Sequence, residues 1–428
     1  MPRHMPGNVL LVAYHYPPCG VSSGLQRTLA FSRYLGRYGW NPVVLSVRPE
    51  AFERTSASQL SDIPTSIVVE RTWAWDASRH LSLGGRYWRR LAVPDRWASW
   101  YLTAVPRALM LCRKHNIHAI WSTYPIATAH RIGAAIARMT GLPWIADFRD
   151  PMVEFNPPTG LWAPRDPVIR NARLAIESAA TRRAQRLVFC TEQASRIVAD
   201  RYPILDRQRL VVITNGYEES TFRDAESIAP APAPKGRRVL LHSGTIYATP
   251  DRDPTALFQA LHALKVQGAV SAESFELRLR NPSSEEYFHE LAAQTGVGDL
   301  VTVLPPLPYR EALAEMITAS GLLLLQGMTS NPAVPAKLYE YLRAGRPIVA
   351  LVHANGETAH ALRAAGIGVR ASLSDVDSIV QLLLRWIRDP DFYAAATSDP
   401  ASVARYSREA LTSTLAALLD EVAPRALS

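Results

Sequence analysis

The sequence predicts an α/β fold made of two facing Rossmann-like domains. Short apolar runs alternate with helical patterns throughout the 428 residues, as they do in proteins built from strand–helix–strand units. The pattern stops at the alternating alanines and prolines of residues 228–236, which can form neither a helix nor a central strand. A chain of this length is also long for a single domain, so two domains joined by a linker are expected.

Each half of the chain supplies its own set of expected strands. They lie at residues 9–13, 43–47, 67–69, 119–121, 144–146, 187–189 and 211–213, and then at 239–242, 275–279, 301–304, 322–325, 348–351 and 369–371. The predicted domains cover residues 1–225 and 237–400, with a linker at 226–236. Residues 401–428 include a helical pattern from Val403 to Val422. In open parallel sheets ligands bind at the carboxyl ends of the strands, and we expect the same here.

Composition places the chain among folded globular proteins, since 48% of its residues are apolar and 20% are charged. The net charge of +9 comes almost entirely from arginine, because the chain has only four lysines. A basic surface suits nucleic acid, anionic lipid or sugar nucleotides. No helix-turn-helix, zinc-finger or RNA-binding motif is evident, which argues against nucleic acid.

The sequence predicts neither a membrane span nor a secretory leader. The apolar run at residues 321–325 ends at Gln326, whereas a spanning helix needs ~20 apolar residues. The first apolar run is short, has no small-residue cleavage site after it, and predicts a strand instead. The three cysteines are far apart and odd in number, which favours a reducing cytoplasm over a disulfide framework.

The segment VPAKLYEYLRAGRPIVA at residues 334–350 predicts a helix with an anion site at its start. Pro335 suits a first helical position and Gly345 suits the position just past the end. Free N–H groups and the positive dipole end favour a phosphate there. Lys337 and Glu340 are three residues apart and share one face. The lysine could hold a diphosphate and the carboxylate could accept ribose hydroxyls; the alternative is an ion pair on a solvated helix.

Polar residues also follow two strands of the first half. Gly20, Ser22, Ser23 and Gly24 come after the first strand, where a glycine-bounded loop lets backbone N–H groups approach a phosphate or a sugar. The alternative is an ordinary strand-to-helix turn.

Asp147, Arg149 and Asp150 come directly after a later strand. Charges there are costly unless solvated or paired, so a cleft is expected. An aspartate could act as a base towards an acceptor hydroxyl or orient a donor sugar, which makes these three the catalytic candidates. The alternative is an internal Asp–Arg pair that shapes the loop.

The chain resembles GT-B glycosyltransferases, in particular the large family 4 and its relatives. Five segments match in the expected order: YHYPPCGVSSGLQR at 14–27, PWIADFRDP at 143–151, LVVITNGYEESTF at 210–222, LLHSGTIYATPDRDPTAL at 240–257 and PAKLYEYLRAGRPIVA at 335–350. The resemblance implies a GT-B fold whose C-terminal helix packs back on the N-terminal domain. It also implies a nucleoside-diphosphate sugar, UDP- or GDP-linked, as co-substrate, with no cofactor and no metal.

The resemblance further implies a set of donor-binding residues. In many members one loop supplies an arginine and a lysine to the diphosphate; here Thr245 stands near the first position and Arg252 near the second, so Lys337 would provide the other cation. Asp251-Arg252-Asp253 also spells the DxD metal motif of a different glycosyltransferase fold, which the two-domain pattern disfavours. The implied donor-binding residues are Gly244, Thr245, Arg252, Asn331, Lys337, Leu338 and Glu340.

The chain departs from the family pattern at two positions. Many relatives carry a second glutamate eight positions before Glu340, where this chain has Pro332, so Asn331 or backbone amides would contact the donor sugar instead. Better-known members often have a histidine in the loop where Arg149 stands. The choice between retention and inversion therefore stays open.

Half of the ten tryptophans fall within residues 73–100, among several arginines. The members are Trp73, Trp75, Trp88, Trp97 and Trp100 with Arg79, Arg86, Arg89, Arg90 and Arg96. This composition suits a membrane–water interface or a lipid-linked acceptor, a stacking platform for an acceptor sugar, or a packed helical insertion. The histidines near strand ends, His15, His130, His242 and His353, show no metal-site spacing and are predicted to be structural.

These observations predict a cytoplasmic glycosyltransferase of hexosyltransferase type, peripheral at the inner membrane face, that serves cell-surface polysaccharide or glycolipid assembly. Its partners would be a nucleotide sugar and a glycan, lipid-linked or small-molecule acceptor. Catalysis would rest on electrostatic support of the leaving diphosphate. The alternatives are a natural-product glycosyltransferase, a sugar-nucleotide epimerase, or a non-catalytic sugar-nucleotide or glycan-binding protein. The missing GxGxxG motif disfavours a NAD-dependent oxidoreductase.

Overall fold

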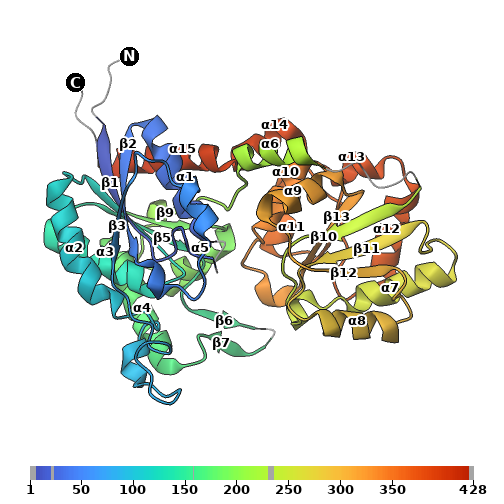
Figure 1. Cartoon of the computed structure of the whole chain (residues 1–428), viewed down its shortest axis with the longest axis horizontal. Coiled ribbons are helices and arrows are strands. Elements are labelled where there is room, and N and C mark those ends of the chain that lie inside the picture. The colour runs from blue at the N-terminus through green and yellow to red at the C-terminus, as the bar shows by residue number, and fades with distance from the viewer. Residues whose placement is uncertain (1–5, 21–23, 158, 230–235, 424–428) are drawn as a thin grey trace. The chain divides into compact units, whose positions relative to one another are not determined.

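The computed structural model describes residues 6–20, 24–157, 159–229 and 236–423. Contacts divide the chain into two compact units, Met1–Thr214 together with Arg408–Ser428 (unit 1) and Asn215–Ser407 (unit 2). Each unit is a parallel sheet with helices on both faces, as Figure 1 shows. The predicted fold class is confirmed.

Unit 1 contains a seven-stranded parallel sheet in the order β3-β2-β1-β4-β5-β8-β9. Its strands are β1 (Gly7–Val12), β2 (Trp40–Val47), β3 (Val68–Thr72), β4 (Ala119–Thr123), β5 (Trp144–Arg149), β8 (Arg186–Phe189) and β9 (Leu210–Val212). Its helices are α1 (Leu25–Tyr34), α2 (Trp100–Lys114), α3 (Ala127–Thr140), α4 (Pro167–Arg183), α5 (Glu192–Arg201) and α15 (Arg408–Val422). A separate antiparallel hairpin, β6 (Glu154–Asn156) and β7 (Leu161–Ala163), was not expected from the sequence.

Unit 2 contains a five-stranded parallel sheet in the order β12-β11-β10-β13-β14. Its strands are β10 (Arg238–His242), β11 (Phe275–Arg280), β12 (Val301–Leu304), β13 (Gly321–Gln326) and β14 (Ile348–Val352). Its helices are α6 (Glu219–Ile228), α7 (Thr255–Val266), α8 (Glu285–Gln294), α9 (Tyr309–Thr318), α10 (Lys337–Ala344), α11 (Glu357–Ala364), α12 (Val376–Arg388), α13 (Phe392–Ala396) and α14 (Pro400–Val403).

The composition of the strands follows from their position in the sheet. The interior strand β13, GLLLLQ, is buried at every residue because helices cover both of its faces. Strand β11, FELRLR, alternates instead, and Leu277 and Leu279 lie in the core of unit 2. A strand with alternating side chains has one apolar and one polar face, so the charges of β11 must be neutralised on the other side.

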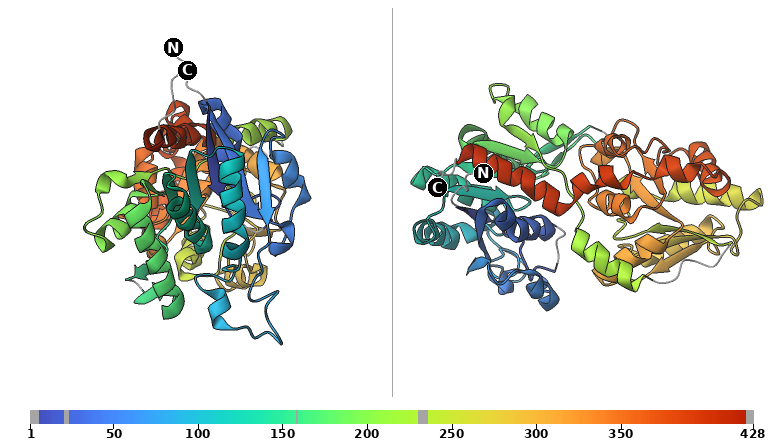
Figure 2. Two further views of the ribbon diagram at one scale, coloured as in Figure 1. Left: turned by 90° about the vertical axis from the view of Figure 1, so that its left-hand side faces the viewer. Right: turned by 90° about the horizontal axis from the view of Figure 1, so that it is seen from above.

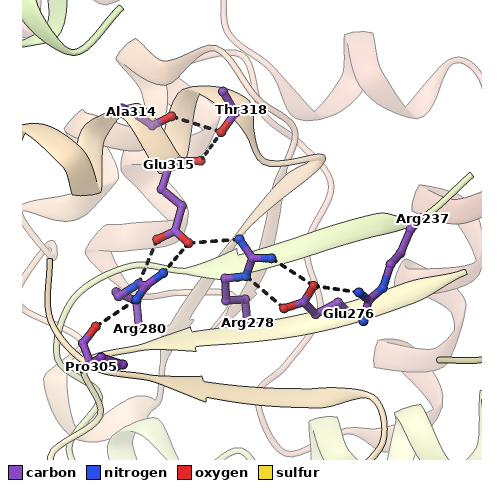
Figure 3. A network of polar contacts seen from close by, with 8 residues as sticks. All are labelled: Arg237, Glu276, Arg278, Arg280, Pro305, Ala314, Glu315 and Thr318. Atoms are coloured by element: carbon purple, nitrogen blue, oxygen red, sulfur yellow. Dashed lines mark hydrogen bonds and ion pairs between the residues drawn. The ribbon is translucent and has the colours of Figure 1, made fainter. Parts of the chain in front are cut away.

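Figure 3 shows how this neutralisation is achieved. Arg278 donates to Glu276 through Nε and Nη2 at 2.9 and 3.0 Å, and through Nη1 to Glu315 of α9 at 3.1 Å. Arg280 also donates to Glu315, with Nε 2.9 Å from Oε2. The network joins β11 to α9.

The C-terminal helix α15 packs on unit 1, as the resemblance implied. It contacts α1, and Leu415 and Leu419 lie in the core of unit 1. Trp40 at the start of β2 donates from Nε1 to Asp420 at 2.9 Å. The right-hand view of Figure 2 shows this helix lying along unit 1.

Two local expectations need correction. Residues 369–371 form no strand but only a single bridge, Leu351 with Ala371, because the chain turns almost at once into α12, which Asp375 caps. The expected helix start at Pro335 is also wrong: Ala336 is the residue before α10, and Lys337 is the first helical residue. Helix α6 runs to Ile228, within the expected linker, and residues 230–235 lie outside the described part. Within that part, no helix is both long and apolar enough for a bilayer crossing.

Removing the buried contacts of α15 tests its role. We expect Leu419→Ala to destabilise unit 1 by about 2–5 kcal/mol, because the side chain is fully buried and its loss leaves a cavity. Denaturant unfolding followed by circular dichroism measures this. Val266→Ala is the control, since Val266 is 74% exposed in unit 2; an equal effect of the two changes would contradict the prediction.

Candidate functional site

The carboxyl end of β10, the turn that follows it and the start of α10 form one compact polar cluster. The N–H of Ser243, just after β10, donates to the hydroxyl of Tyr341 at 2.9 Å. Gly244 has a φ of +87°, a left-handed conformation that favours glycine. A Cβ atom at Gly244 would lie 3.6 Å from the Nζ of Lys337. The turn therefore brings Lys337 against the backbone at residues 243–244.

Lys337 lies in an environment that opposes its charge. Its Nζ is 3.1 Å from Nε2 of His242, which is buried. Burial, and then the positive charge of Arg252, lower the pKa of Lys337 from 10.5 to about 7. Burial lowers the pKa of His242 well below its ordinary value, so this histidine is neutral and can accept from the ammonium. An anion at this turn would stabilise the charged lysine.

Arg252 approaches the same turn from another element, the 3₁₀ turn η6 (Pro250–Arg252). Its Nη1 donates to the carbonyl of Thr245 at 3.3 Å, and its guanidinium lies over the ring of Tyr247 at 5.7 Å. Asn281 donates to Thr245 Oγ1 at 3.3 Å. The structure thus brings together, at the carboxyl end of the middle strand of unit 2, the residues Gly244, Thr245, Arg252 and Lys337.

The two aspartates beside Arg252 fix loops. Asp251 is buried, and its Oδ1 accepts from Thr329 Oγ1 at 2.7 Å and from the N–H of Ser330 at 3.0 Å. Asp253 accepts from the N–H and hydroxyl of Thr255 at the start of α7, at 3.0 and 2.6 Å. In the described ranges no three His, Cys, Asp or Glu residues gather as metal ligands would.

The other predicted donor-site residues have different surroundings. Glu340 Oε1 accepts from the hydroxyl of Tyr309 at 2.6 Å, at the start of α9. Asn331 Nδ2 lies 3.0 Å from Nδ1 of His353. Leu338 is fully buried in the core of unit 2, so it supports α10 and presents no ligand surface.

In unit 1, Asp147 forms a buried ion pair with Arg27 of α1. Arg27 donates to both carboxylate oxygens, each at 2.9 Å, and its Nη1 donates to the carbonyl of Thr214 at 2.9 Å. Thr123 Oγ1 lies 2.9 Å from Oδ2. Asp147 is therefore part of an internal Asp–Arg pair, which was the alternative to a catalytic role for this loop. The pair engages both of its carboxylate oxygens.

Arg149 and Asp150 have a different environment from Asp147. Arg149 has a φ of +61°, which is uncommon for a residue with a side chain. Its Nε and the Nδ1 of His15 are buried and have no hydrogen-bond partner in the described part of the chain. Burial, with Arg149, lowers the pKa of His15 to about 4, and burial raises the pKa of Asp150. These groups could receive a hydroxyl-bearing ligand.

The predicted glycine loop is only partly described. Gly20 donates from its N–H to the carbonyl of Arg54 at 2.9 Å, and a Cβ atom on it would lie 3.3 Å from that same oxygen. Gly24 precedes α1. Ser22 and Ser23 lie outside the described residues.

Sequence reasoning missed several partners of these residues. Arg27, Tyr309 and the role of His15 were not identified, and His242 and His353 were expected to be structural. Arg27 and Asp147 are 120 residues apart, so only the fold brings them together. Only their position in the sequence could have indicated a role for the two histidines. His15 and His242 each lie at or just past the end of the first strand of their unit.

Substitution tests whether the role of Asp147 is structural or catalytic. We expect Asp147→Asn to destabilise unit 1 by about 3–5 kcal/mol, because it leaves the Arg27 charge buried without its partner. Asp150→Asn should change the stability by less than about 1 kcal/mol, because that carboxyl pays a desolvation cost in its charged form. Thermal and denaturant unfolding measure both; equal stability losses would contradict the assignment.

Comparison with known proteins supports the fold. Residues 23–216 match the family model of the glycosyl transferase 4-like domain. No curated protein matches the sequence significantly. Among solved structures, Anabaena HepE in complex with UDP-glucose superposes with a TM-score of 0.62 at 14% identity, covering 97% of this chain and 99% of that one.

Two more solved structures share the fold. WaaG, a glycosyltransferase involved in lipopolysaccharide biosynthesis, has a TM-score of 0.61 at 14% identity, covering 97% of this chain and 100% of its own. A UDP-N-acetylglucosamine 2-epimerase has a TM-score of 0.58 at 13% identity, with coverage of 97% and 96%. The resemblance recognised in the sequence is confirmed: residues 23–216 match the glycosyl transferase 4-like domain, and the chain has the GT-B fold.

Proposed function

We propose that this protein is a metal-independent glycosyltransferase that takes its sugar from a UDP- or GDP-sugar. The observation that carries the proposal is the cationic turn of unit 2, where Lys337, Arg252 and Gly244 meet at the start of α10. Burial and a neighbouring guanidinium make the charge of Lys337 costly, and a bound diphosphate would offset that cost. Two fixed cations and a helix start would supply the charge that a metal provides elsewhere.

The remaining donor groups follow from this placement. Glu340 accepts hydrogen bonds from the ribose hydroxyls, and the hydroxyl of Tyr309 orients its carboxylate. Asn331, held beside His353, contacts the sugar. As the bond between the anomeric carbon and the diphosphate oxygen breaks, negative charge grows on the leaving group, where Lys337 and Arg252 stabilise it.

The acceptor is proposed to bind unit 1. Asp150, whose pKa is raised by burial, would take the proton of the attacking hydroxyl as the new glycosidic bond forms. Arg149 and His15 would orient the reacting groups through their buried nitrogen atoms. Asp147 would act indirectly, by holding the loop through Arg27.

The acceptor class proposed is a glycan or a lipid-linked carrier in cell-surface polysaccharide or glycolipid assembly, and the enzyme would work in the cytoplasm at the inner membrane face. The likeness to WaaG supports this choice, because that protein is described as acting in lipopolysaccharide biosynthesis. A small-molecule aglycone is the alternative acceptor. An epimerase would turn over donor with no acceptor present, and a non-catalytic binding protein would hold donor without turnover.

Glu340 provides a direct test of the donor site. We expect Glu340→Ala to weaken binding of the preferred nucleotide by roughly 1–3 kcal/mol, because a charge-assisted contact to ribose is lost. Calorimetric titration of UDP, GDP, TDP and ADP, in EDTA and in magnesium, measures this. Glu311→Ala is the control, since Glu311 is an exposed carboxylate of α9. If no nucleotide binds, or if both variants bind as the wild type does, the donor site is refuted.

Lys337 makes diphosphate binding depend on pH. Its pKa of about 7 leaves the side chain charged below that pH and neutral above it in the free protein. A bound diphosphate would keep Lys337 protonated. We therefore expect the affinity for UDP or GDP to fall by up to about tenfold between pH 7 and pH 8, with proton uptake on binding. Titration in buffers of different ionisation enthalpy measures the uptake.

Lys337→Arg is the matched variant for this test, because arginine stays charged across the range. It should bind diphosphate without the pH dependence, and the nucleoside alone should show none in either protein. An unchanged slope in Lys337→Arg would show that another group titrates.

A further inference from the structure

A second surface of unit 1 gathers exposed apolar side chains. The exposed tryptophans of the chain are Trp73, Trp75, Trp88 and Trp162. The first three belong to the Trp/Arg-rich segment noted in the sequence, but Trp97 and Trp100 of that segment turn inward and pack on Tyr14. Trp162 belongs to the unexpected hairpin β6–β7.

The first part of this surface is a tight turn at residues 83–86. Leu83 and Arg86 exchange both backbone hydrogen bonds, at 2.8 and 3.1 Å. Gly84 and Gly85 between them have φ values of +57° and +75°, as a two-residue hairpin turn of this hand requires. The turn holds Leu83 at 90% exposure, and Trp88 follows at 66%. An ordered backbone thus presents these apolar groups to solvent.

The second part is the hairpin β6–β7. Phe155 and Trp162 form a cross-strand pair with ring centroids 5.2 Å apart, and both side chains are exposed, as is Leu161. The guanidinium of Arg170 lies 5.5 Å from the centroid of the Trp162 ring. The hairpin therefore repeats the combination of aromatic ring and arginine found in the first part.

An ion pair joins the two parts. Arg89 donates from Nε to Oδ2 of Asp166 at 3.1 Å, and Asp166 also caps α4 by accepting from the N–H of Val168. In Figure 1 both segments lie in the lower part of unit 1, where residues 81–91 project downward and the β6–β7 hairpin projects sideways. We call residues 81–91, 154–157 and 159–170 together the tip surface.

The charge of the tip surface is mostly positive. Residues 81–91 carry three arginines, Arg86, Arg89 and Arg90, and no acidic residue. Residues 154–170 carry Arg165 and Arg170 against Glu154 and Asp166, and Asp166 is paired with Arg89. The apolar groups of the tip surface therefore stand among cations with little opposing charge.

An apolar pocket adjoins the tip surface. It has a volume of about 290 Å³ and lies between α3 and α4, lined by small side chains such as Ala134, Ala172 and Ala175 with Val93 and Pro94. Val93 comes two residues after the tip surface, and Ala172 lies one helical turn after Val168. Arg131 is the charged residue of its lining.

We propose that the tip surface docks unit 1 on an anionic lipid bilayer. Tryptophan and tyrosine rings suit the boundary between headgroups and acyl chains, while arginines keep their charge at the anionic headgroups. A protein partner would require a continuous, shaped apolar core. Here the apolar groups stand on two narrow projections interleaved with arginine. This docking is independent of nucleotide binding, so the two proposals can fail separately.

Vesicle flotation tests the docking. The full chain is mixed with vesicles of phosphatidylcholine alone, or of equimolar phosphatidylcholine and phosphatidylglycerol. We expect binding to the anionic vesicles and little to the neutral ones. Arg86→Gln with Arg90→Gln should reduce the partition coefficient by roughly 30-fold, since each arginine near an anionic surface contributes about fivefold. Leu83→Ser with Trp88→Ser and Trp162→Ser should reduce it at least as much.

Matched controls lie elsewhere on unit 1. Ile204→Ser removes a fully exposed apolar group and Arg207→Gln removes an exposed arginine, and neither should change the partition coefficient. Unchanged circular dichroism and nucleotide binding show that a tip variant is folded. Equal binding to both kinds of vesicle, equal losses in the controls, or binding to neither vesicle would overturn the proposal; the last result would leave the surface to a soluble acceptor or partner.

Discussion

The organisation of this protein depends on a constraint of parallel sheets. Crossover helices must cover both faces of each sheet, so the strands are buried and apolar along most of their length. Along a strand a charge must be paired, as Arg278 and Arg280 of β11 are with Glu276 and Glu315, whereas polar groups where strands end and loops begin have a smaller desolvation cost. Both polar clusters lie there: the turn of His242, Gly244 and Lys337 after β10, and the group of His15, Arg149 and Asp150 after β1 and β5. The candidate chemistry follows from where this fold tolerates charge.

Charges at the same sheet edge differ in what they can do, and pairing makes the difference. Asp147 and Arg27 satisfy each other through two hydrogen bonds of 2.9 Å, so their charges hold the loop. Three residues later Asp150 has no comparable partner among the residues that the structure describes, and burial raises its pKa. In unit 2, Asp251 and Asp253 are likewise engaged by loop hydroxyls and N–H groups, whereas Lys337 has a neutral histidine and a second cation beside it. A group whose charged form is costly in the unliganded protein can gain stability from a ligand of opposite charge.

The exposed aromatic side chains of unit 1 need an explanation of their own. An isolated exposed apolar residue needs no explanation, but a set of them on ordered turns among arginines does. The tip surface combines segments about 70 residues apart in sequence, and Arg89 and Asp166 join them. It gives unit 1 a surface suited to an anionic interface, while in the proposed diphosphate site of unit 2 fixed cations and backbone N–H groups would meet a soluble anion.

The sequence by itself determined the fold class, nearly all the strands and the polar turns at their ends, because hydrophobic periodicity and glycine and proline positions depend on local chemistry. It also determined that Lys337 and Glu340 share one short helix. Tertiary structure alone decided which charges are paired. Arg27 reaches Asp147 across 120 residues, His242 reaches Lys337 across 95, and Tyr309 reaches Glu340 across 31. It likewise turned Trp97 and Trp100 into the core and left Trp88 and Trp162 outside. The reason is physical: burial and charge pairing are properties of what surrounds a side chain, and in a parallel sheet those neighbours come from distant segments.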